Sequence, residues 1–184
     1  MRIIAGQFRG TRLAALGKGD AGAHLRPTSD RVRESLFSML SGGRFGAPLE
    51  GAAVLDLFAG TGALGLEALS RGAASATFVD TGRVALGLIG ENIARCRADN
   101  TTLIRRDGRR LGSGSPHGLV FLDPPYGKGL GEQAMASALA GGWIAPGALV
   151  VWEESSDITV PEALTLLETR HFGGTNISLL RAGG

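Results

Sequence analysis

The amino-acid sequence predicts an α/β fold built on a mainly parallel sheet with helices on both faces. From residue 52 onward, five short apolar runs are interleaved with helical patterns, which indicates repeated strand–helix units. The runs are nearly continuous in apolar residues, as expected for strands that are buried on both faces. After residue 153 this alternation stops. Two last runs face each other across the turn 172–174, so we expect them to pair antiparallel.

The expected elements follow in chain order. Residues 2–6 and 11–16 flank a turn and predict a hairpin, and residues 17–24 predict a loop. Apolar spacing then predicts a helix that starts near Pro27, Thr28 and Ser29 and ends at Gly42-Gly43. Strands are expected over 53–58, 75–80, 101–104, 118–123 and 148–153, with helices over 63–71, 83–98 and 132–140. The last two strands are expected over 164–169 and 176–181.

Length and composition narrow the class of protein. A chain of 184 residues with 43% hydrophobic residues suits one domain with a short appendage and excludes a disordered chain. The single cysteine, Cys96, excludes a disulfide framework and a cysteine-based zinc site. The three histidines, His24, His117 and His171, lack the spacing of metal ligands, so no metal is expected. Because no apolar stretch is long enough to span a membrane, we expect a soluble cytoplasmic protein.

The charges are unevenly distributed along the chain. Residues 1–44 contain eight Lys and Arg against three Asp and Glu, a net charge of +5, and residues 45–184 contain eleven against fourteen, a net charge of −3. We therefore expect a basic hairpin-and-helix extension over 1–44 and a main domain over 45–184. A basic extension is typical of contact with a polyanion such as nucleic acid. A genome bias toward arginine explains the preference for Arg over Lys but not the asymmetry.

A glycine-rich turn follows the first predicted strand of the main domain. Gly60, Gly62 and Gly65 satisfy G-x-G-x-x-G between a strand and a helix, where small residues let the backbone approach a ligand. Dinucleotides and other adenosine-bearing cofactors share such turns. Asp56, near the end of the strand, would repel a pyrophosphate. It favours a cofactor whose near end is cationic, such as the sulfonium and ammonium of S-adenosylmethionine.

Two further acids follow the next two predicted strands. Asp80 ends the second strand, 20 residues after Gly60, where a carboxylate can accept hydrogen bonds from both ribose hydroxyls. Asp107 follows the third strand, where an acid can bind the exocyclic amine of adenine. Its arginine neighbours offer Asp107 a different role, as their counter-charge.

The sharpest motif is Asp123-Pro124-Pro125-Tyr126, at the end of the fourth predicted strand. Two consecutive prolines remove two N–H donors and fix two φ angles, so the loop is stiff and its carbonyls are free to accept. The Asp123 carboxylate and the Pro124 carbonyl can accept the two hydrogens of an exocyclic amine while Tyr126 stacks on the base. Such acceptors favour a pyramidal nitrogen whose lone pair can attack a methyl group, so the motif is predicted to be catalytic.

Together these motifs resemble the class I S-adenosylmethionine-dependent methyltransferases of the D-P-P-Y type. The sequence is more narrowly similar to the bacterial family that methylates the N2 amine of guanine 966 in 16S rRNA, and the similarity spans nearly the whole chain. Two amino-terminal segments narrow it, residues 2–6 (R-I-I-A-G) and 26–34 (R-P-T-S-D-R-V-R-E). The sequence departs from the family pattern at His117-Gly118, where an aromatic residue and an Asp are usual.

The resemblance implies a fold, a cofactor and residue roles. The implied fold is a Rossmann-like, seven-stranded, mostly parallel sheet with an antiparallel last strand, preceded by the hairpin and helix. The implied cofactor is S-adenosylmethionine, with S-adenosylhomocysteine as product. The implied partner is 16S rRNA within a small-subunit assembly particle, with the chain acting as a monomer. The cofactor would be held by Asp56, Phe58, Gly60, Gly62, Asp80 and Asp107, and the target guanine by Asp123, Pro124, Pro125 and Tyr126. RNA phosphates would be met by Arg2, Arg9, Arg12, Arg26, Arg31 and Arg33, with Thr28 near the cofactor.

Three alternatives stay open on the sequence. An adenine-N6 methyltransferase acting on DNA or RNA presents a similar amine to the same acceptors, although such DNA enzymes usually carry a target-recognition insertion for which 184 residues leave little room. An NAD-dependent oxidoreductase would use the glycine-rich turn but not the 123–126 motif, and it needs a substrate domain. A non-catalytic RNA-binding module fits the basic extension but leaves residues 123–126 without a role.

Overall fold

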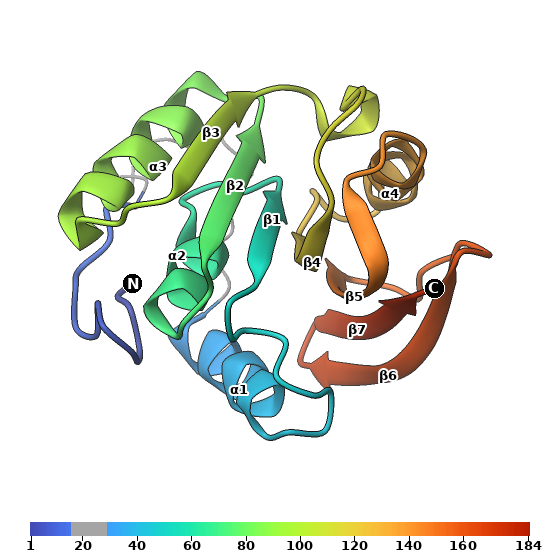
Figure 1. The fold of residues 1–184 in the computed structure, drawn as a ribbon, viewed down its shortest axis with the longest axis horizontal. Coiled ribbons are helices and arrows are strands. Elements are labelled where there is room, and N and C mark those ends of the chain that lie inside the picture. Colours follow the sequence, from blue (N-terminus) through green and yellow to red (C-terminus); the bar gives the residue numbers. More distant parts are fainter. Residues whose placement is uncertain (16–28) are drawn as a thin grey trace.

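The computed structural model describes residues 1–15 and 29–184, and within them seven strands form one sheet (Figure 1). The strands are β1 (Ala53–Leu57), β2 (Ser75–Asp80), β3 (Thr101–Arg105), β4 (His117–Leu122), β5 (Ile144–Glu154), β6 (Leu164–Phe172) and β7 (Thr175–Ala182). Their order in the sheet is β3-β2-β1-β4-β5-β7-β6. The first five strands pair in parallel, whereas β7 pairs antiparallel with both β5 and β6. The predicted sheet, mostly parallel with an antiparallel last strand, is therefore confirmed.

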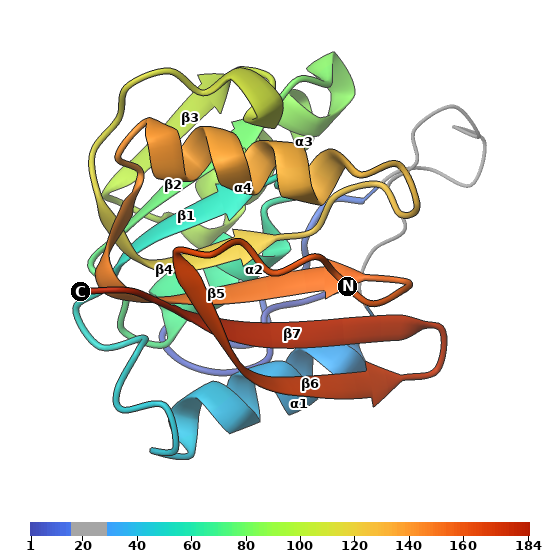
Figure 2. The same cartoon turned by 90° about the vertical axis from the view of Figure 1, so that its right-hand side faces the viewer.

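Helices cover both faces of the sheet, because successive strand residues point to opposite sides and both sides are apolar. The helices are α1 (Asp30–Ser41), α2 (Ala63–Ser70), α3 (Arg83–Cys96) and α4 (Leu130–Ala140), with a short 3-10 helix over Gly108–Arg110. On one face, Phe37 of α1 and Leu66 of α2 share a core with Phe78 and Phe121 of the sheet. On the other, Met135 of α4 belongs to a second core, and Figure 2 shows α1 and α4 on opposite sides of the strands. In the part of the chain that the structure describes, no helix is long and apolar enough to cross a membrane.

The bounds of the elements differ most from the sequence prediction at β5. The sequence predicts a strand over 148–153, but β5 begins at Ile144 and continues through Pro146 and Gly147. His117 of β4 pairs with Ile144, but Leu119 pairs with Leu149, so the register shifts between these two pairs. Pro146 and Gly147 lie in this irregular stretch of β5, where a proline is tolerated. Pro146 and Gly147 are typical of a turn, so the sequence prediction began the strand after them and missed the first residues of β5.

The first residues form a hairpin-like turn seated on the end of α2. Its two arms share an isolated antiparallel bridge between Arg2 and Arg12, far less pairing than two predicted strands would give. Gly6 has a φ of +82°, and a Cβ on it would lie 1.7 Å from the Ser70 carbonyl oxygen, so this close approach requires glycine. Ile3 is fully buried in the same core as α1 and α2. The basic extension thus packs onto the main domain.

A buried carboxylate fastens this amino-terminal segment to α2. Glu67 is fully buried, and its Oε2 accepts the Ile4 N–H over 2.8 Å. Its Oε1 accepts the Ala5 N–H over 3.1 Å and the Arg71 Nε–H over 2.8 Å. The Nε of Arg33, from α1, lies 3.9 Å from Glu67 Oε2. Glu67 therefore joins the amino-terminal segment, α1 and α2 at one buried point.

The helix α1 begins and ends where the sequence predicts. The side-chain oxygen of Ser29 accepts the Val32 N–H over 3.3 Å, which caps the first turn. Gly42 ends the helix. The other predicted start signals, Pro27 and Thr28, and the predicted loop over 17–24 lie outside the described residues.

Candidate active site at the carboxyl edge of the sheet

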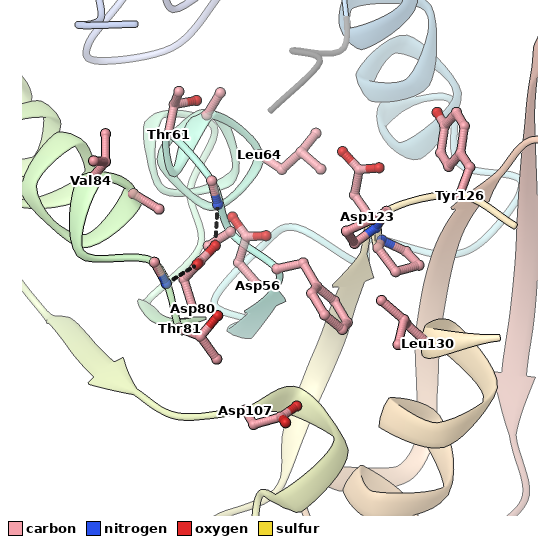
Figure 3. Close-up of a pocket in the computed structure, with 18 of the residues that line it drawn as sticks. Asp56, Thr61, Leu64, Asp80, Thr81, Val84, Asp107, Asp123, Tyr126 and Leu130 are labelled. Carbon is pink, nitrogen blue, oxygen red and sulfur yellow. Dashed lines mark hydrogen bonds between the residues drawn. The ribbon is translucent and has the colours of Figure 1, made fainter. Parts of the chain in front are cut away.

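A cleft of about 1250 Å³ lies at the carboxyl edge of the sheet, where β1 runs between β2 and β4. In open α/β sheets, ligands bind at this edge at the point where the strand order reverses. Most residues predicted for cofactor and target line this cleft: Asp56, Phe58, Gly60, Asp80, Asp107, Asp123, Pro124, Pro125 and Tyr126. Figure 3 shows Asp56, Asp80, Asp107, Asp123 and Tyr126 arranged around it. Gly62 is buried behind the turn, where a Cβ would lie 3.4 Å from side-chain atoms of Ile89 and Phe78.

Two carboxylates shape the glycine-rich turn. Asp56 is buried, and its Oδ2 accepts the Gly65 N–H from the first turn of α2 over 2.9 Å. Asp80 bridges two loops, because its Oδ2 accepts the Gly60 N–H over 3.0 Å and its Oδ1 accepts the Gly82 N–H over 2.8 Å (Figure 3). Both carboxylates therefore order the backbone around the cleft and still line it themselves.

Phe58 joins β1 to the glycine-rich turn in a strained conformation. Its φ of +58° lies in the left-handed region, which side chains other than glycine rarely adopt. Its ring packs beside Gly108, where a Cβ would lie 3.4 Å from two ring carbons. Such strain persists where the surroundings fix the backbone, and it clusters at functional sites. The strained residue thus lies within the predicted cofactor set and lines the cleft itself.

Burial and neighbouring carboxyl groups raise the pKa of two acids of the cleft, Asp56 and Asp123. Burial raises the pKa of Asp56 to about 8, the charge of Asp80 adds to this, and the hydrogen bond from Gly65 opposes it. Removal from water also raises the pKa of Asp123 well above its usual range, and the nearby Glu153, Asp56 and Glu154 raise it further. Perturbed acids that gather in a cleft mark it as a functional site. Within the described residues, however, no group of His, Cys, Asp and Glu is arranged to hold a metal ion.

The 123–126 motif follows β4 and crosses toward the last residues of β5 and the first residue of β7. The Tyr126 hydroxyl donates to Glu153 Oε1 over 2.5 Å and lies 3.1 Å from the Thr175 Oγ1. Burial and the hydrogen bond to Glu153 raise the pKa of this hydroxyl. In Figure 3 the Asp123 carboxylate points into the cleft, and the Tyr126 ring stands at its far wall. The motif therefore offers an acceptor and a flat ring to the same space.

Asp107 lines the cleft but is held by an arginine. Its Oδ1 accepts the backbone N–H of Arg109 over 2.9 Å, and its Oδ2 accepts the Arg109 Nη2–H over 2.7 Å. This pairing lowers the pKa of Asp107. Asp107 therefore acts as a counter-charge to Arg109, one of the two roles that the sequence left open. It also lines the cleft, as expected of a residue that contacts adenine.

The structure corrects the expectation for Arg33. Its side chain is 1% exposed, and its Nη2 donates to the Arg2 carbonyl and, over 2.9 Å, to Asp30 Oδ1. A side chain this deeply buried does not meet RNA phosphates on the surface. The sequence carried a signal for this, because Arg33 lies on the same helical stripe as Leu36, Phe37 and Leu40. The buried Nη1 has no hydrogen-bond partner among the described residues, and Arg33 lines the cleft.

The other predicted RNA-contacting arginines lie on the surface or outside the described part. Arg2, Arg9 and Arg31 line a second cavity of about 350 Å³, between the amino-terminal segment and α1, together with Asp30 and Glu34. Arg12 is exposed nearby on the same turn. Arg26 and Thr28 lie outside the described residues.

Several buried polar residues around the cleft were not predicted. Glu153 and Glu154 end β5 as Asp80 ends β2, so the same strand-end signal applied to them. Asn92 lies in the middle of α3, where no local pattern singles it out. Its Nδ2 donates to the carbonyl of Thr61 over 2.8 Å, and its Oδ1 accepts the N–H of Ala14 over 2.6 Å. It ties the amino-terminal segment to the glycine-rich turn.

Comparison with known proteins places this site in a family. Residues 1–181 match the family described as "Conserved hypothetical protein 95". The chain is 40% identical to Ribosomal RNA small subunit methyltransferase D of Escherichia coli over 164 residues, covering 88% of this chain and 78% of that protein. It is 35% identical to the protein of the same name from Haemophilus influenzae, covering 94% and 89%.

Solved structures agree with the sequence relatives. The structure of yhhF from Escherichia coli superposes with a TM-score of 0.85 at 34% identity and covers 100% of this chain and 98% of that one. The structure of HI0767 from Haemophilus influenzae gives a TM-score of 0.79 at 31% identity, covering 100% and 99%. On the family match, these identities and the shared Rossmann-like fold, the chain belongs to the family of the small-subunit ribosomal RNA methyltransferase D proteins and is a methyltransferase.

Proposed function

We propose that this methyltransferase transfers a methyl group from S-adenosylmethionine to the N2 amine of a guanine in small-subunit rRNA, guanine 966 of 16S rRNA. One observation carries the proposal. The acids of the glycine-rich turn and the 123–126 motif line the same cleft. Direct displacement needs donor and acceptor held in line within a near-attack distance, and a single cleft lined by both sets of residues supports that.

The residues around the glycine-rich turn fit this cofactor. Each Asp80 oxygen accepts one backbone N–H, and a carboxylate oxygen has capacity for a second donor, such as a ribose hydroxyl. Asp56 supplies negative charge for a cationic ligand, and such a ligand would lower its raised pKa. The buried Nη1 of Arg33 has no partner among the described residues, and it is a donor suited to the carboxylate of the amino-acid part. When bound, the cofactor supplies an electrophilic methyl group on a sulfonium.

The 123–126 motif prepares the attacking amine. The Asp123 carboxylate and the Pro124 carbonyl accept the two N2 hydrogens, which concentrates the nitrogen lone pair toward the methyl group. The Tyr126 ring stacks on the guanine and fixes its plane. As N2 bonds to the methyl carbon, the bond from that carbon to the cofactor sulfur would break and leave a neutral thioether, and Asp123 would accept the surplus proton from the nitrogen. Its raised pKa makes it a stronger base than an exposed Asp.

The surface between the amino-terminal segment and α1 is proposed to bind rRNA phosphates. Arg2, Arg9 and Arg31 gather around a single cavity there, and arginines are well suited to phosphate contacts. Reversing Arg2 and Arg31 to Glu is expected to weaken rRNA binding at least about tenfold and to reduce the salt dependence by about two in log–log slope. Reversing Arg170, on β6, changes the net charge by two where the pair changes it by four, so twice the effect of Arg170→Glu is the control for net charge alone. Equal rRNA affinity of the wild type, the Arg2 and Arg31 double variant and the Arg170 variant would refute the proposal that this surface binds rRNA.

The reaction is tested by mapping the product. The protein is incubated with radiolabelled S-adenosylmethionine and small-subunit particles that lack the modification, and the labelled nucleoside is identified. We expect label on the N2 of one guanine, and less than about 1% of that rate with Asp123→Ala at unchanged cofactor affinity. Label on adenine would favour the adenine-N6 alternative, and full activity of Asp123→Ala would remove the role of Asp123.

The same assay addresses the partner. Comparing naked 16S rRNA with assembled particles shows which of them is the substrate, and sedimentation of the free protein shows whether it acts as the proposed monomer. We place this activity in the cytoplasm, where the assembling bacterial small subunit is found. Faster labelling of particles than of naked rRNA is the expected outcome.

A further inference from the structure

The last two residues of β5 contact two consecutive residues of the turn that follows β4, Tyr126 and Gly127. Glu153 accepts the Tyr126 hydroxyl over 2.5 Å, and Glu154 Oε1 accepts the Gly127 N–H over 3.1 Å. Both acids are buried, with 7% and 5% of their surface exposed. Neighbouring residues of a strand point to opposite faces, yet both reach the turn, because it crosses over the end of the strand. The turn after β4 is therefore held by the end of the next strand in the sheet.

Tyr126 is anchored from two strands. Besides Glu153 on β5, its hydroxyl lies 3.1 Å from the Oγ1 of Thr175, the first residue of β7. Trp152↔Ser178 and Glu154↔Asn176 are register partners in the antiparallel pairing of these strands, so β7 brings its first residues beside the end of β5. The antiparallel strand at this side of the sheet thereby contributes to the site.

Glu153 also contributes charge to the reacting centre. Three carboxylates act on Asp123: Glu153 and Glu154 at the end of β5, and Asp56 near the end of β1. The other charged residues that line the cleft in the described part of the chain are Arg33, Asp80, Arg83, Asp107, Arg109 and Lys128. Among these carboxylates, Glu153 is the one that hydrogen-bonds to the tyrosine of the motif. A single side chain thus touches the stacking ring and acts electrostatically on the acceptor.

We propose that Glu153 is a positioning residue for methyl transfer, which holds the Tyr126 ring through its hydroxyl so that the ring presents one face to the target base. A tyrosine ring without this anchor would sample several χ1 rotamers, and stacking would have to select one of them at an entropic cost. Glu153 contacts neither the methyl group nor the amine in this arrangement. The inference rests on the proposed function for the identity of the base, but the anchoring itself is measurable without RNA or cofactor.

The anchoring is tested first in the free protein. Tyr126 is the single tyrosine of the sequence, so tyrosine labelled with carbon-13 at the hydroxyl-bearing ring carbon gives one resonance that reports this residue alone. Glu153→Ala is expected to shift this resonance and to let the hydroxyl ionise at lower pH, because a nearby negative charge is removed. Glu154→Ala is the matched control, since Glu154 contacts Gly127 and Ser155 but not the hydroxyl. A resonance and titration that remain at their wild-type values in Glu153→Ala would overturn the anchoring.

The effect on catalysis is tested with a double-mutant cycle. Glu153→Ala is expected to raise the KM for rRNA about tenfold, the size of one lost charge-assisted hydrogen bond, while the dissociation constant of S-adenosylmethionine changes less than about twofold. Glu153→Gln keeps an acceptor oxygen and is expected to restore most of the KM. In a Tyr126→Phe background, which lacks the hydroxyl, replacing Glu153 by Ala is expected to raise the KM by less than about twofold further. Full multiplication of the two effects would mean that Glu153 does not act through Tyr126.

A pH profile separates positioning from mere structural support. Because Glu153 raises the pKa of Asp123, Glu153→Gln is expected to move the acidic limb of kcat to lower pH. An unmoved limb would contradict the electrostatic part of the inference. Absence of guanine methylation by the wild-type protein would instead refute the proposed function and leave the tyrosine resonance as the deciding measurement for Glu153.

Discussion

Replacing Glu67 by Ala is expected to destabilise the protein and to loosen its amino-terminal segment together. The carboxylate is fully buried, accepts the N–H groups of Ile4 and Ala5 and the Nε–H of Arg71, and lies 3.9 Å from the Nε of buried Arg33. Removing one partner of a buried ion pair leaves the other charge uncompensated, which costs about 3–5 kcal/mol. The lost N–H acceptors act in the same direction.

This cost is large beside the total stability of a domain, about 5–15 kcal/mol. For a chain of this size, 1 kcal/mol corresponds to about 2–4 °C in Tm, so Glu67→Ala is expected to lower Tm by about 6–20 °C. Urea unfolding gives the free energy directly, and amide hydrogen exchange at Ile4 and Ala5 should accelerate more than exchange in β4. The control is Glu91→Gln, which changes an exposed carboxylate paired with Arg95 on α3 and is expected to cost less than about 0.5 kcal/mol.

A double variant tests the same buried charges in a second way. A combined Glu67→Leu and Arg33→Met substitution removes the buried carboxylate together with the fully buried guanidinium, while the Arg71 side chain keeps 14% exposure to water. It is therefore expected to be less destabilising than Glu67→Ala by itself. A Tm of Glu67→Ala within about 2 °C of the wild type would refute the central role of this carboxylate. So would a double variant that is less stable than the single one.

Three other changes follow from the geometry of the cleft and its supporting helices. Burial raises the pKa of Asp56 from 3.8 to about 8, so between these pH values the folded protein keeps a proton that the unfolded chain releases. The stability that this group contributes is therefore present below pH 4 and is lost as the pH rises through 8. Urea unfolding of the ligand-free protein at pH 5 and pH 8 should show this fall, and Asp56→Asn should flatten it; an unchanged slope would contradict the assignment. Gly65→Ala puts a Cβ 2.4 Å from Phe78 Cε1 and is expected to cost about 1–3 kcal/mol by overpacking. Gly87 lies in the exposed middle of α3, and no atom lies within 4 Å of a Cβ added there, so Gly87→Ala is instead expected to raise the free energy of unfolding by about 0.5–1 kcal/mol. Urea unfolding that ranks Gly87→Ala below Gly65→Ala would contradict this.

The alternation of strands and helices could be predicted because each element carries its pattern locally. Apolar runs, capping by Ser29 and the stop at Gly42 depend on neighbours within a few residues, and the structure places α1 and β1 to β4 close to the predicted bounds. The strand-end acids Asp56 and Asp80 could be predicted for a related reason. Parallel strands bring their carboxyl ends to one edge whatever the details of packing. The irregular start of β5 escaped prediction, since a bulge depends on the partner strand.

The environment of each side chain was decided by the tertiary structure. Arg31 and Arg33 are two residues apart in one helix and alike in sequence, yet Arg31 lies on the surface beside Arg2 while Arg33 is buried, because they point to opposite sides of α1. The contacts of Glu67 with the amino-terminal segment join groups more than 60 residues apart. The sequence by itself determined the elements, the edge of the sheet at which the chemistry is proposed and the D-P-P-Y motif. Which charges are buried, paired or exposed depended on long-range packing, which no local pattern encodes.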